Sequence, residues 1–431
     1  MLDHTHNASA TSWVQSANGH AQFPIQNLPL GICNNGEGGI VIAIGDQALN
    51  IKAAIATGHL NQLESELLTA LNQPTLNAWM QLNATQRLKI RHAVFELLSQ
   101  NHASKRDAEH LLIDVQAADM AVPADIGDFT DFYCGIHHAI KAGSVFRPDN
   151  PLLPNYAHMP LAYHGRSSSI NVSGKHIYRP HGQRLQNEQP ELGPSQRLDF
   201  ELELAMWAGP GNQQGQSIPV SKAGRHIAGY SLFNDWSARD IQAWEYRPLG
   251  PFQGKNFAAT VGPWVVSDHA LAPFRCQAMA RREDHPKLLD YLKDEFDQTS
   301  GGLNITLNVF LSSEQMRQQG LPPFQIAQSN SQHLYWTPAQ MVAQHTLSGC
   351  NLRPGDLIAT GTISTPNNNG NGSLLEISQG GKRTLKLPSG EQRLFLEDGD
   401  EVIFTGHCSH PDFYKIGFGE CRARIVSNPY T

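Results

Sequence analysis

Apolar and acidic residues alternate in the segment Leu198-Asp199-Phe200-Glu201-Leu202-Glu203-Leu204-Ala205-Met206. A period of two is typical of a β-strand with one apolar face. Glu201 and Glu203 would then lie on one side, about 6.5 to 7 Å apart along the strand, where their carboxylates repel unless a positive charge is near. A bound cation would relieve the repulsion, but a solvated strand face would need none. The segment alone leaves both interpretations open, and Asp199, on the same side near the strand's start, is set aside.

The length and charge of the chain limit the classes of protein that fit. With 431 residues it exceeds what one hydrophobic core normally supports, so we expect two domains. Hydrophobic residues make up 40% of the chain, which is enough for a sizeable core. The net charge of -7, with no basic stripe, argues against a nucleic-acid partner and favours small-molecule chemistry.

The cysteines and the first residues of the chain indicate where in the cell the protein is expected to be. The six cysteines are scattered without a CxxC pair, which favours reduced thiols over a disulfide framework or a zinc site. The segment Met1 to His6 has no basic and apolar signal-peptide pattern, and no apolar run approaches the about 18 residues of a membrane span. We therefore expect a soluble cytoplasmic protein that has no membrane partner.

Two patterns along the chain predict a domain boundary near residue 120. Residues 1–120 contain a short apolar strand at 39–45 and helical patterns near 61–71 and 84–100. The basic residues of the second helix are expected on a solvated face. Residues 121–431 contain short strands separated by Gly, Pro and Asn, as in a β-rich domain, with the clearest loop at 366–372.

A second chemical segment, 234–246, has a helical pattern that Pro248 would end. Its polar residues at i, i+4, i+7 and i+11 would form one stripe on a helix and offer a metal ligand, oxyanion donors and a substrate hydrogen bond to one pocket. They are Asp235, Arg239, Gln242 and Tyr246. An exposed face with an Asp235–Arg239 ion pair, worth under about 0.5 kcal/mol, explains the same spacing.

The segment Gly250-Pro251-Phe252-Gln253-Gly254-Lys255-Asn256 superficially suggests a phosphate loop. It has three residues between its glycines and no Ser or Thr after Lys255, so it is not a Walker motif. Lys255 would instead bring an ammonium close to the carboxylates and stabilise a developing anion, unless it is an ordinary surface lysine.

A third segment, 126–139, has Asp131, Tyr133, His137 and His138 close together. Most of the 20 histidines are expected to be solvent-exposed or structural, and proximity to Asp131 raises the case for these two. No GxSxG elbow is present, which disfavours a serine nucleophile of the α/β-hydrolase type.

Several blocks in one order carry a resemblance to a known family. They are Phe23 to Pro29, Asp131-Phe132-Tyr133, Tyr163-His164-Gly165-Arg166, Leu198 to Glu203, Asn234 to Gln242, Pro248 to Phe252, Gly361 to Ser364 and Ile416 to Gly419. Together they resemble the fumarylacetoacetate hydrolase family nearly end to end, and a set of blocks in order is far more specific than any one spacing above.

This resemblance implies a mainly β fold with α+β elements. An N-terminal SH3-like barrel, residues 1–120, would precede a C-terminal mixed β-roll, residues 121–431, in a homodimer. The implied activity is hydrolysis of the carbon–carbon bond of 4-fumarylacetoacetate to fumarate and acetoacetate, the last step of tyrosine and phenylalanine degradation.

The resemblance also implies site residues. The calcium ligands would be Asp131, Glu201, Glu203 and Asp235, an all-carboxylate set that suits Ca²⁺, Mg²⁺ or Mn²⁺. The cation would hold the diketo oxygens and stabilise the enolate-like leaving group as a Lewis acid. His138 would activate water with Glu376 orienting it, while His137 would be a bystander.

Further positions follow from the same resemblance. The groups facing the tetrahedral oxyanion would be Arg239, Gln242 and Lys255, and the substrate-contacting residues would be Tyr133, Arg147, Tyr163, Gln242, Tyr246 and Thr362. Arg147 is the natural partner for a substrate carboxylate.

The chain departs from the family at Ala259. The family has a threonine there, associated with a second, magnesium site that includes the positions of Asp235 and Lys255. Thr260 comes one residue late, which puts the Mg²⁺ site in doubt, and catalysis should not depend on it.

Two other functions fit the carboxylates. A relative in the same superfamily could be a decarboxylase, isomerase or acylpyruvate hydrolase acting on another oxo-acid, and a non-catalytic protein could use the cation only for rigidity. The N-terminal domain and the His138–Glu376 pair argue against such a relative, because the shorter relatives usually lack that domain. The non-catalytic alternative is favoured less still.

Overall fold

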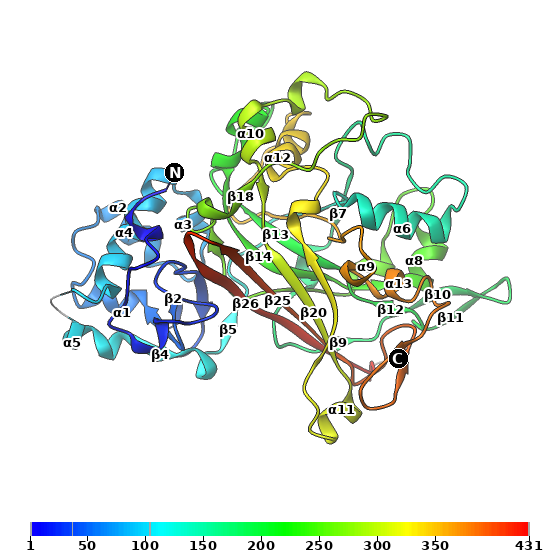
Figure 1. The fold of residues 1–431 in the computed structure, drawn as a ribbon, viewed down its shortest axis with the longest axis horizontal. Coiled ribbons are helices and arrows are strands. Elements are labelled where there is room, and N and C mark those ends of the chain that lie inside the picture. Colours follow the sequence, from blue (N-terminus) through cyan, green and yellow to red (C-terminus); the bar gives the residue numbers. More distant parts are fainter. Residues whose placement is uncertain (1, 37, 103–104, 430–431) are drawn as a thin grey trace.

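The computed structural model describes residues 2–36, 38–102 and 105–429. The N-terminal elements, blue to cyan in Figure 1, form a lobe beside a larger part that contains the long strands. Among the described residues, no helix is both long and apolar enough to cross a membrane.

The N-terminal lobe is built on an antiparallel sheet with the strand order β4-β3-β2-β1-β5. Its strands are β1 (Leu30–Cys33), β2 (Gly39–Ile44), β3 (Gln47–Asn50), β4 (Leu112–Asp114) and β5 (Met120–Ala121). Its helices are α1 (Ile51–Ala56), α2 (Ser65–Leu71), α3 (Asn77–Gln81), α4 (Ala84–Leu98) and α5 (Lys105–Ala108). The predicted strand and both predicted helices are confirmed, while closure as an SH3-like barrel stays a prediction.

The larger part is organised around an eight-stranded mixed sheet with the order β7-β6-β22-β13-β14-β16-β8, where β17 also pairs with β14. Its strands are β6 (Phe129–Phe132), β7 (Ala162–Gly165), β8 (Ile170–Val172), β13 (Leu202–Ala208), β14 (Ile227–Asp235), β16 (Ala259–Val261), β17 (Val266–Ser267) and β22 (Leu357–Ala359). Within this sheet, the described residues form two parallel pairs, β6–β22 and β8–β16.

A second, five-stranded sheet, β21-β20-β25-β26-β9, packs on this one. Its strands are β9 (Ile177–Tyr178), β20 (Thr306–Ser312), β21 (Phe324–Asn330), β25 (Glu401–His410) and β26 (Phe413–Val426). One hydrophobic core joins the two sheets, with Leu204 and Leu232 of the first and Val309 and Phe404 of the second among its buried members.

Short strand pairs and helices complete this part. The pairs are β10 (His181–Gln186) with β11 (Gln189–Pro194), β12 (Leu198–Asp199) with β15 (Ser237–Ala238), β18 (Arg275–Cys276) with β19 (Gly302–Leu303), and β23 (Leu385–Lys386) with β24 (Gln392–Arg393). The helices are α6 (Ile136–Phe146), α7 (Val220–Ala223), α8 (Arg239–Glu245), α9 (Gln253–Asn256), α10 (Glu295–Ser300), α11 (Glu314–Gln318), α12 (Pro338–Thr346) and α13 (Leu374–Ile377). Helices α6, α8, α9 and α13 gather at one side of the larger part in Figure 1.

The alternating pattern of strand β13 directs its side chains into two different cores. Leu204 and Met206 pack into the core between the two sheets, while Ala205 and Trp207 pack into the core shared with the N-terminal lobe. The strand is therefore buried on both faces, and a solvated face for the acidic side is excluded.

The continuous strand predicted over 198–206 is interrupted at Phe200 and Glu201, between β12 and β13. The backbone N–H of Glu201 donates to the side-chain oxygen of Asn234 (3.1 Å) instead of joining the regular ladder. This side-chain bond explains the local break in pairing.

The helix predicted over 234–246 is wrong for its first residues. Asp235 is the last residue of β14, where it pairs with Ala259 of β16, and α8 begins only at Arg239. The apolar run before Asn234 extends as a buried strand, and its ladder holds Asp235 in the sheet. Tertiary pairing has overridden the helical spacing.

The basic residues of α4 are not all solvated, contrary to the prediction. Arg87 and Arg91 are buried, and Arg87 donates to the Ile227 carbonyl in the larger part (3.2 Å). Arg91 donates to the carbonyls of Gln26 and Asn27 and to the Thr5 hydroxyl, so this helix is fixed by polar as well as apolar contacts.

Replacing Arg91 should destabilise the protein because its carbonyl partners would stay buried without a donor. Arg91→Met is expected to lower the free energy of unfolding by about 2 to 4 kcal/mol, whereas Lys89→Met on an exposed face of α4 should change it by less than about 0.5 kcal/mol. Urea unfolding measures both, and equal midpoints for Arg91→Met and the unaltered protein would contradict this role.

Candidate metal centre and active site

Four carboxylates from three segments meet in one buried cluster. Asp131 lies on β6, Glu201 just before β13, Glu203 on β13 and Asp235 at the end of β14. All four residues are buried, and each offers an oxygen within 4.8 Å of those of the others. The structure thus brings together all four predicted ligands.

Strand order explains this convergence. Strands β13 and β14 are neighbours, and β22 alone separates β13 from β6. The register opposes Leu202 to Asn234 and Ala359 to Asp131, which brings the acidic residues to the same end of three strands. Glu201 and Glu203 lie on one side of their segment, as predicted.

The electrostatics of the cluster favour a cation. Burial, followed by the neighbouring Asp235 and Asp131 carboxylates respectively, raises the pKa of Asp131 and of Glu203 well above their usual values. Burial also raises the pKa of Asp235 despite the nearby Lys255 ammonium. Only for Glu201 do Lys255 and Arg239 outweigh burial and lower the pKa. The cluster is therefore short of positive charge.

The donor set fits a hard divalent cation. Asp131 Oδ1 and Glu203 Oε1 are buried and have no hydrogen-bond partner among the described residues. Oxygen-only, carboxylate-rich sites suit Ca²⁺ or Mg²⁺ and not metals that prefer thiolates. The orphaned oxygens are the observation that a ligated cation would account for.

Two cations of the protein border the cluster. Lys255 Nζ on α9 lies 2.5 Å from Glu201 Oε2 and 2.5 Å from Asp235 Oδ2, and Arg239 Nη1 on α8 lies 2.8 Å from Glu201 Oε1. Lys255 is therefore buried against the carboxylates and is no surface lysine. The alternative Asp235–Arg239 pair is not formed, because Arg239 pairs with Glu201 and Asp199 instead.

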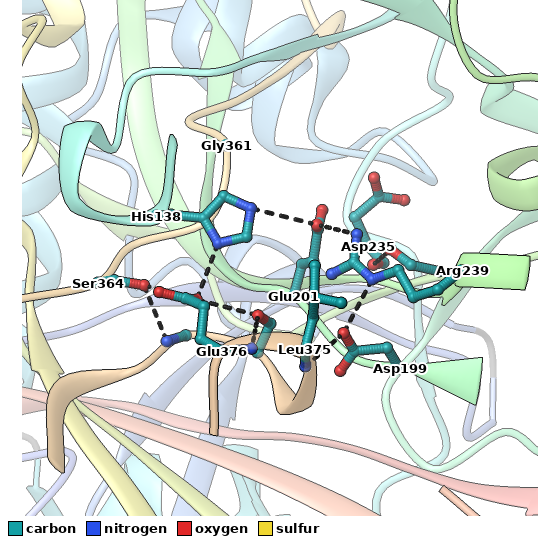
Figure 2. Close-up of polar contacts among 12 residues, drawn as sticks. His138, Asp199, Glu201, Asp235, Arg239, Gly361, Ser364, Leu375 and Glu376 are labelled. Atoms are coloured by element: carbon teal, nitrogen blue, oxygen red, sulfur yellow. Dashed lines mark hydrogen bonds and ion pairs between the residues drawn. The ribbon is translucent and has the colours of Figure 1, made fainter. Parts of the chain in front are cut away.

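His138 and Glu376 form a buried pair beside this cluster (Figure 2). The His138 Nδ1 lies 2.8 Å from Glu376 Oε2, and the His138 Nε2 lies 3.7 Å from Glu201 Oε1. Despite burial, His138 and Lys141 lower the pKa of Glu376, which keeps it ionised. In the neutral ring with its proton on Nδ1 and bonded to Glu376, the Nε2 that faces the carboxylate cluster is the nitrogen able to accept a proton.

Most of the predicted substrate residues surround these groups. The Tyr163 hydroxyl donates to Asp235 Oδ2 (2.8 Å), and the Tyr133 ring meets the His138 ring edge-on at 5.7 Å. Thr362 Oγ1 is buried without a partner among the described residues. The Gln242 Oε1 accepts from Arg239 Nη1 (3.3 Å).

Two predicted substrate residues have no direct contact with the cluster among the described contacts. Arg147, just after α6, donates to the Pro151 carbonyl (3.1 Å). Burial raises the pKa of the Tyr133 phenol, and the charge of Arg147 acts in the opposite direction. Tyr246, at the end of α8, contacts the Arg247 guanidinium, 5.0 Å from its ring centre, and no described contact joins it to the cluster.

The departure at Ala259 has a structural counterpart. Ala259 pairs with Asp235 across β16 and β14 and supplies no side-chain oxygen. The Thr260 hydroxyl accepts from Trp236 Nε1 (2.8 Å) and is thus engaged in the core.

Sequence reasoning missed Asp199, Ser364 and Ser373. Asp199 accepts from Arg239 Nε (2.9 Å), and both serine hydroxyls donate to Glu376 Oε2 at 2.9 Å. The alternating pattern places Asp199 on the same side as Glu201 and Glu203, but its partners are distant in sequence. No pattern in the sequence connects either serine to Glu376.

A second group of potential ligands, Asp3, His4 and His92, lies in the N-terminal lobe. Asp3 already accepts from the backbone and hydroxyl of Thr5 and pairs with His92 Nε2 at 2.8 Å. Its carboxylate is satisfied without a cation, unlike those of the buried cluster.

Comparisons with known proteins agree with this architecture. The family model described as fumarylacetoacetase N-terminal matches residues 26–123, and that described as fumarylacetoacetate (FAA) hydrolase C-terminal matches residues 129–426. The chain belongs to the fumarylacetoacetate hydrolase family. Its larger part is the family's C-terminal domain.

Full-length relatives are closely similar. Proteins named fumarylacetoacetase from Bos taurus and Homo sapiens are each 44% identical over 418 residues, covering 94% of this chain and 96% of theirs. The fumarylacetoacetase of Arabidopsis thaliana is 44% identical over 419 residues, covering 95% of this chain and 97% of its own. A solved structure of a putative HpcE protein from Mycobacterium smegmatis shares the fold, with a TM-score of 0.51, 17% identity, and coverage of 93% of this chain and 99% of its own.

Calcium added to chelator-treated protein should raise the melting temperature, because it binds the folded cluster and not the unfolded chain. At about one hundred times the dissociation constant the stabilisation is about 2.7 kcal/mol. Glu203→Gln should lose most of this gain, whereas Glu191→Gln on an exposed strand should keep it. Thermal scans with and without calcium measure the difference, and an equal gain in all three proteins would contradict the assignment.

The same gain should depend on pH. Protons compete with the cation for Asp131 and Glu203, whose pKa values are raised, so the calcium-induced shift should be larger near about pH 8 than near about pH 5.5. Without calcium the pH dependence of stability is opposite. The free energy of unfolding then falls as pH rises through the raised folded-state pKa values of these carboxyl groups, because their ionisation destabilises the fold. A calcium shift independent of pH would contradict the predicted titration.

Proposed function

We propose that this protein hydrolyses the carbon–carbon bond of 4-fumarylacetoacetate to give fumarate and acetoacetate. The relatives named fumarylacetoacetase, 44% identical over nearly the full chain, support the substrate. The observation that carries the chemistry is the His138–Glu376 pair, whose free imidazole nitrogen faces the carboxylate cluster at 3.7 Å. A base beside a cation site is what water-dependent cleavage needs.

His138 acts as the general base in this proposal. Its Nε2 takes a proton from water, and the water oxygen bonds to the carbonyl carbon on the fumaroyl side. The bond between this carbon and the acetoacetate carbon then breaks, and its electron pair leaves as an enolate. The enolate takes up the proton held by His138, and the new carboxylic acid releases a proton to give fumarate.

Glu376 holds the imidazole for this exchange. It accepts the Nδ1 proton at 2.8 Å, fixes the tautomer, and stabilises the positive charge that forms when Nε2 is protonated. Two serine hydroxyls on Glu376 Oε2 hold this carboxylate in turn.

Positive groups meet the oxyanion formed by water attack. Arg239 Nη2 is buried without a partner among the described residues and is free to donate. Lys255 adds an ammonium, and Gln242, bonded to Arg239, adds an amide donor. Such preorganised donors act strongly because the site is buried.

The remaining contacts would select the substrate. Arg147 suits a terminal carboxylate, and the unpaired hydroxyl of Thr362 suits a polar oxygen. The phenols of Tyr133 and Tyr163 border the His138 ring and Asp235. Tyr246, at the end of α8, is also proposed to contact the substrate.

The cation is proposed to be Ca²⁺, held by Asp131, Glu201, Glu203 and Asp235. When bound it supplies Lewis-acid polarisation of the diketo oxygens and stabilises the leaving enolate. A second, Mg²⁺ site involving Lys255 and Asp235 has less support because Ala259 offers no hydroxyl.

The wider setting is also proposed by analogy. We infer an N-terminal SH3-like barrel over residues 1–120, a catalytic β-roll over residues 121–431, a cytoplasmic homodimer, and a place at the end of tyrosine and phenylalanine catabolism. Nothing in the composition suggests a nucleic-acid partner or a membrane partner.

His138→Ala should reduce turnover of fumarylacetoacetate by about 10² to 10⁴-fold, because it removes the general base. His137→Ala is the matched control, since the neighbouring ring meets the His333 ring edge-on at 5.7 Å and its Nε2 has no hydrogen-bond partner among the described residues. The loss of substrate absorbance measures both, with acylpyruvates as comparison substrates.

The calcium-induced rise in melting temperature should persist in His138→Ala, which separates loss of the base from loss of the cation site. Undiminished turnover by a folded His138→Ala protein would remove His138 as the base. Faster hydrolysis of acylpyruvates than of fumarylacetoacetate by the unaltered protein would overturn the proposed substrate.

A further inference from the structure

Asp199 is a fully buried carboxylate beneath the active site. Its Oδ1 accepts from the backbone N–H of Phe200 (2.8 Å) and of Leu374 (2.7 Å), and its Oδ2 accepts from the N–H of Leu375 (3.0 Å) and from Arg239 Nε (2.9 Å). Figure 2 shows this carboxylate between the Arg239 guanidinium and the backbone that leads to Glu376. Both oxygens are therefore saturated by donors.

The backbone contacts fix a very short helix. Helix α13 has four residues, and a single turn is unstable by itself because few of its N–H groups have partners within the helix. Asp199 takes up the first two N–H groups of α13, and the Ser373 side chain accepts the N–H of Glu376. The position of Glu376, and through it that of the His138 ring, therefore depends on Asp199.

The side-chain contact fixes Arg239. A guanidinium held at Nε has its plane fixed, which also fixes where its two other nitrogens lie. In Arg239 these are Nη1, which bonds Glu201 and Gln242, and Nη2, which has no partner among the described residues. Asp199 thus fixes the position of this free donor.

We propose that Asp199 is a positioning residue that locks the oxyanion arginine and the His138–Glu376 pair into one geometry. This inference rests on the proposed function and deepens it. Asp199 touches no substrate, because it is fully buried and lies behind Arg239 and α13. Its single carboxylate bonds Arg239, 40 residues further along the chain, and Leu375, 176 residues further along the chain.

Asp199→Asn tests the role with almost no change of shape. An amide has one acceptor oxygen and a donor NH₂ group, so it cannot accept all four hydrogen bonds, and its NH₂ group would oppose two of the donors that now bond one carboxylate oxygen. A displacement of this kind costs about 10²-fold in rate, so we expect kcat to fall by about that factor, with KM within about twofold of the unaltered value. The calcium-induced rise in melting temperature should remain.

Asp400→Asn is the matched control. Asp400 is also fully buried and accepts from Arg393 at 2.9 and 3.0 Å and from the Glu397 backbone at 2.9 Å, but its partners belong to no part of the active site. This variant should lose stability and keep kcat. Unaltered kcat in Asp199→Asn, or an equal loss of kcat in Asp400→Asn, would overturn the proposal.

A double variant checks the route of the effect. If Asp199 acts partly through Glu376, then Asp199→Asn with Glu376→Gln should lose less activity than the product of the two single losses. Fully multiplicative losses would show that the two residues act independently and would overturn the coupling.

A readout without substrate separates this proposal from the proposed function. In nitrogen-15 NMR, the hydrogen-bonded Nδ1 proton of His138, identified by its absence in His138→Ala, should shift or broaden in Asp199→Asn but not in Asp400→Asn. An unmoved signal in Asp199→Asn would overturn the positioning role. If the unaltered protein failed to hydrolyse fumarylacetoacetate, the proposed function would fail while this spectroscopic test still decided the role of Asp199.

Discussion

Mutual repulsion among four buried carboxylates is the constraint on which the catalytic part depends. Asp131, Glu201, Glu203 and Asp235 lie within 4.8 Å of one another at one end of the large sheet. Charges so close and so far from water are costly unless opposite charge compensates them. Lys255 and Arg239 compensate in part, and the orphaned oxygens of Asp131 and Glu203 mark where compensation is missing. A divalent cation bound by these oxygens would complete the charge balance and hold three segments together.

The His138–Glu376 pair is built against this cluster. Glu201 contributes to the cluster, bonds Lys255 and Arg239, and lies 3.7 Å from the His138 Nε2, so it connects the base, the positive groups and the cation site. Behind this connection, Asp199 and two serines immobilise Arg239 and Glu376. The site is therefore supported on two sides by buried polar contacts with matched donors and acceptors, which is how a rigid geometry is maintained.

The large sheet also explains why the N-terminal lobe and the catalytic part are packed together. Alternate residues of β13 contribute to two cores, one shared with the second sheet and one shared with the lobe. Buried Arg87 adds a polar contact across this second interface. Disturbing the lobe should therefore affect strand β13, which carries Glu203.

Local patterns predicted part of this structure. The period of two placed Glu201 and Glu203 on one side, and apolar patterns located the strand near residue 40 and the helices in the lobe. Spacing failed for Asp235, because strand pairing with Ala259 overrode a helical pattern, and for Arg87 and Arg91, whose carbonyl partners no local pattern reveals. The His138–Glu376 bond spans 238 residues, so only resemblance to a family suggested it. The sequence predicts no role for Asp199 because it stands near the strand's start, and its partners, Arg239 and α13, become neighbours only in the fold.

The most direct measurement is a crystal structure of the protein grown with saturating calcium, with the ion identified by its anomalous scattering. Our account predicts one ion bound by oxygens from Asp131, Glu201, Glu203 and Asp235 at about 2.3 to 2.6 Å, with the His138 imidazole facing it. An ion bound elsewhere, or four carboxylates that stay close without any ion between them, would contradict it.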